Sequence, residues 1–177
     1  MVFTLEELKE AIKLFSVNQL DYFAESCIVA LESNNHKSGC KLKIFGDSSD
    51  EASVEWSTIV LRAGYQEPKK FVENGAIALS FFLVREYTDF AVIEEATIGT
   101  GFDFWLGYDQ DHPMYNALNF ISARLEISGI LKESRSNTIE SRTINKKTQT
   151  NPTDFLKLPA YISIVEFSQP KAYFAAK

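Results

Sequence analysis

The order in which helical and strand-like periodicities follow one another limits the folds open to this chain. Near the N-terminus, apolar residues recur at helical spacing in two segments, and we expect amphipathic helices over residues 4–15 and 18–31. Thr4 and Glu7 have the spacing of a capping box at the start of the first one. Two β-rich segments separated by a polar turn then predict a β-hairpin over residues 40–62.

The second half of the chain begins with a long, mostly apolar segment. Residues 69–87 predict a largely buried helix whose weak point is Asn74–Gly75, because glycine lowers helix stability. Short apolar, β-rich segments and one polar helical segment follow: strands at 91–98, 102–106, 123–130 and 161–167, and a helix at 139–150. This order predicts an α/β or α+β fold, a mixed sheet flanked by helices, as a single domain over residues 1–177.

Composition excludes several classes of protein. A chain of 177 residues that is 45% hydrophobic buries enough surface for a core without disulfides or metals. No apolar run approaches the roughly 18 to 20 residues of a membrane helix, and the N-terminal segment is acidic where a secretory signal is basic. We therefore expect a cytoplasmic protein with no membrane partner. The two cysteines and two histidines lack zinc-site spacing, and both thiols are expected to be reduced.

Charge is divided unevenly along the chain. The formal net charge is -6, but residues 132–177 contain eight Lys and Arg against four acids, which leaves -10 for residues 1–131. An acidic protein does not bind nucleic acid through its overall charge. The basic segment allows two interpretations. It could lie beside an acidic pocket and hold a phosphodiester near a metal ion, or it could be a solvated loop.

Two acids lie inside apolar strand segments, where an unpaired charge is costly. Asp103 is flanked by aromatic residues in GTGFDFWLG, and Glu126 by Leu and Ile in ARLEISGIL. If the two strands are neighbours, both carboxylates can converge, and such a pair suits Mg²⁺ and metal-assisted phosphodiester hydrolysis. Glu95 is a further candidate ligand if no bulge intervenes. The alternative for each acid is a strand with one face in solvent.

The order of these elements resembles the core of the PD-(D/E)xK nuclease superfamily over residues 69–168. The resemblance rests on a helix with Glu73 near its start, a strand, an Asp at the next strand, and a Glu on a third strand, followed by a helix and a strand. It implies a restriction-endonuclease-like core in which Asp103 and Glu126 bind Mg²⁺ for cleavage of DNA or RNA. The family has a lysine two residues after the Glu, where this chain has Ser128.

In some members of the superfamily the basic residue comes from the following helix, and this chain offers Lys146 and Lys147 there. By that resemblance, one of these lysines counters charge on the phosphate and Gln149 orients substrate or water. At helical spacing Arg142 shares a face with Lys146. Ser128 and Arg142 are the candidate substrate-binding residues.

Two functions from different classes remain open. The first is a small Mg²⁺-dependent nuclease-like enzyme, with residues 1–65 as an appended region that packs on the nuclease-like sheet. The second is a non-catalytic interaction module with a protein partner, such as an accessory or immunity-type protein of a bacterial defence or toxin operon. The missing lysine after Glu126 and the acidic charge favour the second function.

Overall fold

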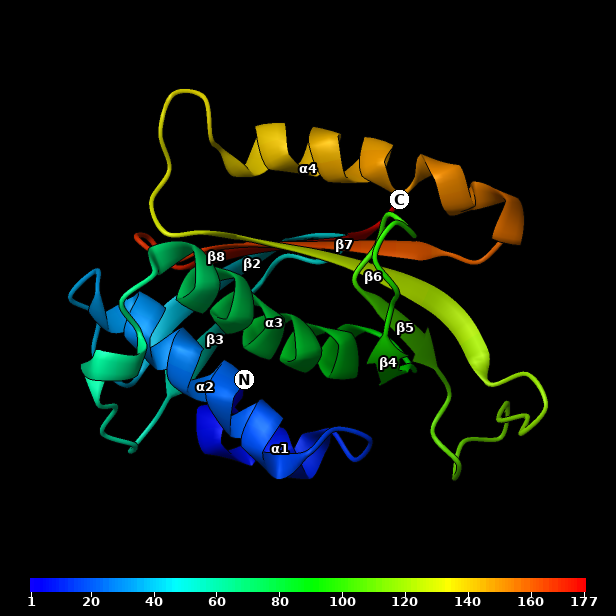
Figure 1. Ribbon diagram of the computed structural model, residues 1–177, viewed down its shortest axis with the longest axis horizontal. Helices are drawn as coiled ribbons and strands as arrows, with labels where there is room; N and C mark the ends of the chain where they lie inside the picture. The colour runs from blue at the N-terminus through cyan, green and yellow to red at the C-terminus, as the bar shows by residue number, and fades with distance from the viewer.

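The computed structural model describes residues 1–177 and is built around one mixed sheet of eight strands (Figure 1). Along the sheet the strands follow the order β1-β3-β2-β8-β7-β6-β5-β4. Their bounds are β1 Val2–Thr4, β2 Cys40–Gly46, β3 Asp50–Glu55, β4 Ala91–Glu95, β5 Phe104–Gly107, β6 Ile121–Ile130, β7 Ala160–Glu166 and β8 Lys171–Ala176. Three neighbouring pairs are parallel (β1 with β3, β2 with β8, β6 with β7), and the other four are antiparallel.

Helices cover both faces of this sheet. Figure 1 shows α1, α2 and α3 on one side and α4 alone on the other. The α-helices are α1 Leu8–Ala11, α2 Val17–Glu32, α3 Pro68–Tyr87 and α4 Ile139–Gln149. The expected mixed sheet flanked by helices is therefore confirmed as an α+β fold. None of the helices combines the length and the apolar character that crossing a membrane requires.

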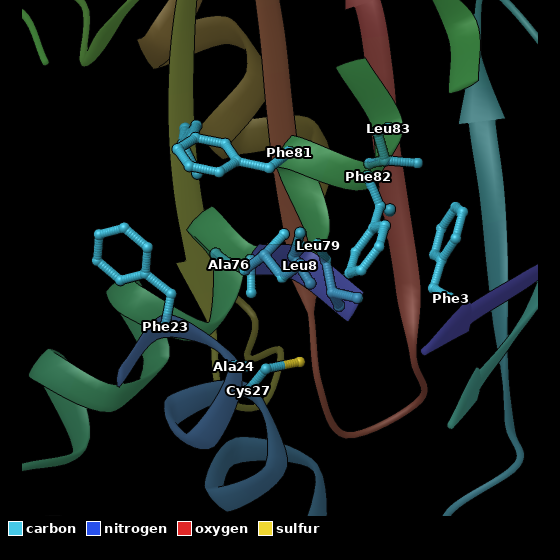
Figure 2. Close-up of a cluster of buried hydrophobic side chains, with 14 of the residues drawn as sticks. Phe3, Leu8, Phe23, Ala24, Cys27, Ala76, Leu79, Phe81, Phe82 and Leu83 are labelled. Atoms are coloured by element: carbon cyan, nitrogen blue, oxygen red, sulfur yellow. The ribbon is translucent and has the colours of Figure 1, made fainter. Parts of the chain in front are cut away.

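The main core lies between the sheet and the α1–α3 layer. Figure 2 shows part of it, with side chains from β1, α1, α2 and α3 packed together, among them the stacked rings of Phe3 and Phe82. This cluster of 35 buried residues draws on both the first 65 residues and the later strands. A second cluster of four isoleucines lies under α4: Ile130, Ile139, Ile162 and Ile164.

The expected helix over residues 4–15 is wrong. Residues 2–4 pair in parallel with β3, Leu5–Glu7 form a 3₁₀ turn, and only Leu8–Ala11 are α-helical. The Thr4 side chain makes no cap hydrogen bond. Leu5 and Leu8 are buried as the helical pattern required, but strand pairing with β3 overrides local helix propensity.

The hairpin is present, but its second strand begins earlier than expected. β3 occupies Asp50–Glu55, whereas residues 56–61 form no strand. The Glu6 carboxylate accepts hydrogen bonds from the backbone N–H groups of Ser57 and Thr58, which ties this segment to the N-terminus instead. The strand β8 was not expected, because its sequence KAYFAA is short and weakly β-forming.

Gly75 lies where α3 passes closest to α2. A Cβ atom added at Gly75 would stand 2.8 Å from the Cα of Cys27, closer than packed atoms approach. The helix nevertheless runs without interruption from Pro68 to Tyr87. The residue that weakens helix propensity is thus the residue that lets the two helices approach.

We predict that Gly75→Ala destabilises the protein although alanine favours helices. The added methyl group forces α2 and α3 apart and should lower the free energy of unfolding in urea by about 1–3 kcal/mol. Gly64→Ala is the control, because nothing lies within 4 Å of a Cβ there. Equal effects of the two substitutions would contradict the close-approach explanation.

Candidate functional site

Pairing between β5 and β6 brings Asp103 and Glu126 to opposite positions. Phe104 is the partner of Leu125 in this antiparallel ladder. One step further, the backbone N–H of Asp103 donates to the carbonyl of Leu125 at 2.9 Å. Asp103 therefore stands opposite Glu126, and opposite residues present their side chains on the same face of a sheet.

The two carboxylates are held differently. Asp103 Oδ2 accepts a hydrogen bond from the backbone N–H of Ile127 at 2.7 Å, which fixes its position against β6. Glu126 is fully buried, and its Oε1 accepts a hydrogen bond from Lys146 Nζ. Its Oε2 is buried with no hydrogen-bond partner.

Glu166, a second buried acid of the sheet, differs from Glu126 in its hydrogen bonding. Glu166 is 1% exposed, yet both of its oxygens are bonded to the turn that follows β7. The backbone N–H groups of Ser168 and Gln169 each donate to it at 2.8 Å. Glu166 is therefore satisfied by its own chain, whereas no amide, amine or hydroxyl group of the chain donates to Glu126 Oε2.

Burial raises the pKa values of both acids. Desolvation, followed by the charge of Asp103, raises the pKa of Glu126 from 4.5 to about 7. Desolvation also raises the pKa of Asp103, against the lowering effects of its hydrogen bond to Ile127, of the Lys146 charge and of its side-chain hydrogen bond with Glu126. Two carboxylates whose charges disfavour each other become more acidic when a cation lies between them.

Helix α4 carries the basic side chains to this pair. A capping box between Thr138 and Ser141 begins the helix. Arg142 and Lys146 are one turn apart and line the same cavity as Asp103, in keeping with the helical spacing. At the other end, the buried Arg124 of β6 donates to the Thr150 carbonyl at 3.3 Å, which ties the end of α4 to the sheet.

The remaining candidates of α4 lie apart from the carboxylates. Lys147 Nζ is 6.0 Å from the centre of the Tyr173 ring on β8, so it does not join the acids. The exposed Gln149 accepts a hydrogen bond from Lys146 at 3.2 Å and touches the site only through that lysine. Of the two lysines considered from the sequence, Lys146 is the one at the site.

Asp103 lines a cavity of about 310 Å³, whereas Glu126 is fully buried and is not among the lining residues. β5 pairs with β6 only as far as Leu125, so beyond this point the edge of β6 has no strand beside it. Helices from both faces of the sheet reach this edge. The lining residues are Glu73, Asn74, Ile77, Glu95, Asp103, Phe104, Ile127, Ser128, Arg142 and Lys146.

The structure adds polar side chains from α3 to the site. Glu73 and Asn74 line the cavity, and the charge of Glu73 contributes to the raised pKa of Asp103. Asn74 did not emerge as a site residue from the sequence, and Glu73 did so only through the family resemblance. The available signal was a pair of polar residues in an otherwise apolar helix.

Glu95 does not join the carboxylate pair. The register shifts between Val92 and Glu94, which makes Phe104 the cross-strand partner of Glu95. Glu95 therefore lies on the opposite face of the sheet from Asp103, although it lines the same cavity. No three acidic, histidine or cysteine side chains form a group able to hold a metal ion. Glu95 thus lines the cavity from the other face, and its assignment as a third ligand stays a prediction.

The residues present fit a hard divalent cation. Mg²⁺ is bound by one or two carboxylates and completes its shell with water and substrate phosphate oxygens. Asp103 and Glu126 supply such oxygens, and Glu126 Oε2 is buried without a partner. Lys146 supplies positive charge at this place through its ion pair with Glu126.

Comparisons with protein-family models, with curated proteins and with solved structures find no match to this chain. The functional argument therefore rests on the geometry of the site.

We predict that stability depends on pH through Glu126. Because its folded pKa is raised to about 7 from 4.5, the folded state binds the proton more tightly, and stability falls as pH rises between these values. Relative to wild type, Glu126→Gln should gain on the order of 2 kcal/mol in unfolding free energy between pH 5 and pH 8. Urea titrations at both pH values measure this change, and Glu95→Gln should keep the wild-type dependence.

A further prediction concerns the lysine that faces Glu126. Lys146→Met should lower unfolding free energy at pH 8 by about 2 kcal/mol, because it leaves a buried carboxylate without its counter-charge. The loss should shrink at pH 5, where Glu126 is protonated. Lys147→Met is the matched control and should cost about 0.5–1 kcal/mol at both pH values through its contact with Tyr173.

Proposed function

We propose that this protein is a Mg²⁺-dependent, nuclease-like hydrolase of phosphodiesters in DNA or RNA. The observation that carries the proposal is the convergence of Asp103, Glu126 and Lys146 from two neighbouring strands and the following helix. Two buried acids side by side are costly in a sheet, and no amide, amine or hydroxyl group of the chain donates to Glu126 Oε2. A metal ion bound at this place would offset the free-energy cost of burying the two acids.

The side chains divide the chemistry between them. Asp103 and Glu126 would hold the metal ion, which would act as a Lewis acid on a phosphoryl oxygen. Lys146 places an ammonium group beside the same carboxylates and stabilises negative charge that develops on the phosphate. Arg142 is held by hydrogen bonds to Ser128 at 3.0 Å and to Asn137 at 2.7 Å, and it orients the substrate phosphate.

The element order is a second line of support. From α3 to β7 the chain runs helix, three strands, helix, strand, as the resemblance to the PD-(D/E)xK superfamily implies. The family pattern has a lysine at the position of Ser128. In this chain Lys146 of α4 contacts Glu126 instead and supplies an ammonium group at the same carboxylate. The lysine missing from the strand therefore does not argue against catalysis.

We expect Mn²⁺ or Mg²⁺ to bind the wild-type protein in calorimetric titrations and to lose binding in the double variant Asp103→Ala, Glu126→Ala. Affinity should rise with pH through about 7, since Glu126 must lose its proton to bind metal. Glu95→Ala is the control and should keep the site. Absence of binding both alone and with a phosphorothioate oligonucleotide present would contradict the proposal.

Cleavage completes the test. With Mg²⁺, single-stranded DNA, duplex DNA and RNA should be assayed with wild type and with Asp103→Asn, Glu126→Gln and Lys146→Met. Each variant should lower the rate by about 100-fold or more, because each removes a group that acts on the transition state. Lys147→Met should retain activity. Metal binding without cleavage of any substrate would favour the non-catalytic interaction module instead.

A further inference from the structure

A second cavity adjoins the carboxylate site. It has a volume of about 270 Å³ and shares Glu73 and Arg142 with the first cavity. Its other lining residues come from the start of α3, the end of β6 and the loop before α4: Pro68, Lys69, Val72, Gly129, Ile130, Leu131 and Asn137. The two cavities together follow the edge of β6 beyond its pairing with β5.

Arg142 stands at the junction of the two cavities in a fixed position. Its Nε donates to Asn137 Oδ1 and its Nη1 donates to Ser128 Oγ. No hydrogen bond within the chain uses its Nη2. A guanidinium held by two neutral partners keeps its full charge, and the planar fork that remains suits a phosphate oxygen.

The charge of the lining side chains differs between the two adjoining cavities. At one end lie Asp103 and Glu126, where a metal ion would meet a phosphate. At the other end Lys69 and Asn137 line the second cavity, with Glu73 as its one acidic lining residue. Lys69 is exposed and forms no ion pair, so its charge is available to an anion.

We propose that the second cavity binds the neighbouring phosphate of a single strand of nucleic acid whose reacting phosphate lies at Asp103 and Glu126. This subsite rests on the proposed function. Arg142 contacts the strand at the junction, and Lys69 contacts the next phosphate along it. The cavities of about 310 and 270 Å³ adjoin each other between α3 and α4, so a strand that passes from one to the other meets Arg142 and then Lys69.

The matched pair Lys69→Met and Lys70→Met tests this subsite. The two lysines are adjacent, exposed and lose the same charge, but only Lys69 lines the cavity. Binding of a fluorescent dinucleotide and of a longer single-stranded oligonucleotide is measured by anisotropy, with Ca²⁺ in place of Mg²⁺ to prevent turnover. Wild type should bind the longer strand more tightly than the dinucleotide.

Lys69→Met should weaken binding of the longer strand about fivefold and reduce the dependence of log K on log salt by about 0.7. Lys70→Met should keep most of the affinity. Equal effects of the two variants, or tighter binding of a duplex than of a single strand, would overturn the proposed subsite. Neither result would bear on the proposed hydrolytic function, which the cleavage assay tests separately. Conversely, the expected binding pattern without any cleavage would overturn only the hydrolytic function.

Discussion

The buried carboxylate of Glu126 is the group on which the arrangement of the site depends. A charge with no exposure inside a sheet is costly, and the chain balances only one of its two oxygens, through Lys146 on α4. That contact requires α4 to lie on the face opposite the three other helices. The capping box at Thr138 and the buried Arg124 at the other end hold the helix there.

The sheet itself creates the opening that the site uses. β6 is paired with β7 from Arg124 to Ile130, but β5 stops beside Leu125. The free edge that remains admits side chains from α3 on one face and from α4 on the other. Acids, an arginine and a lysine therefore meet at a place that no single helix or strand forms, and the adjoining cavity continues along the same edge.

Sequence periodicity predicted most of the helices and strands, but not the strands that form only by pairing with other strands. The helices α2, α3 and α4 and the strands β4 to β7 lie within a few residues of the expected segments. Residues 2–4 became a strand because β3 offered an edge, although their neighbours have helical spacing. β8 was not foreseen because its short, alanine-rich sequence acquires strand structure from pairing with β7 and β2.

For the site, the sequence by itself determined that Asp103 and Glu126 sit in apolar strand segments and that Arg142 and Lys146 share a helix face, because periods of two and 3.6 are local properties of the backbone. Only the tertiary structure decided that the two strands are neighbours in the register that aligns the acids, that Lys146 and not Lys147 faces them, and that a bulge turns Glu95 to the other face. Strand register and helix placement arise from contacts between residues distant in sequence, and packing against the sheet selects among locally equivalent choices.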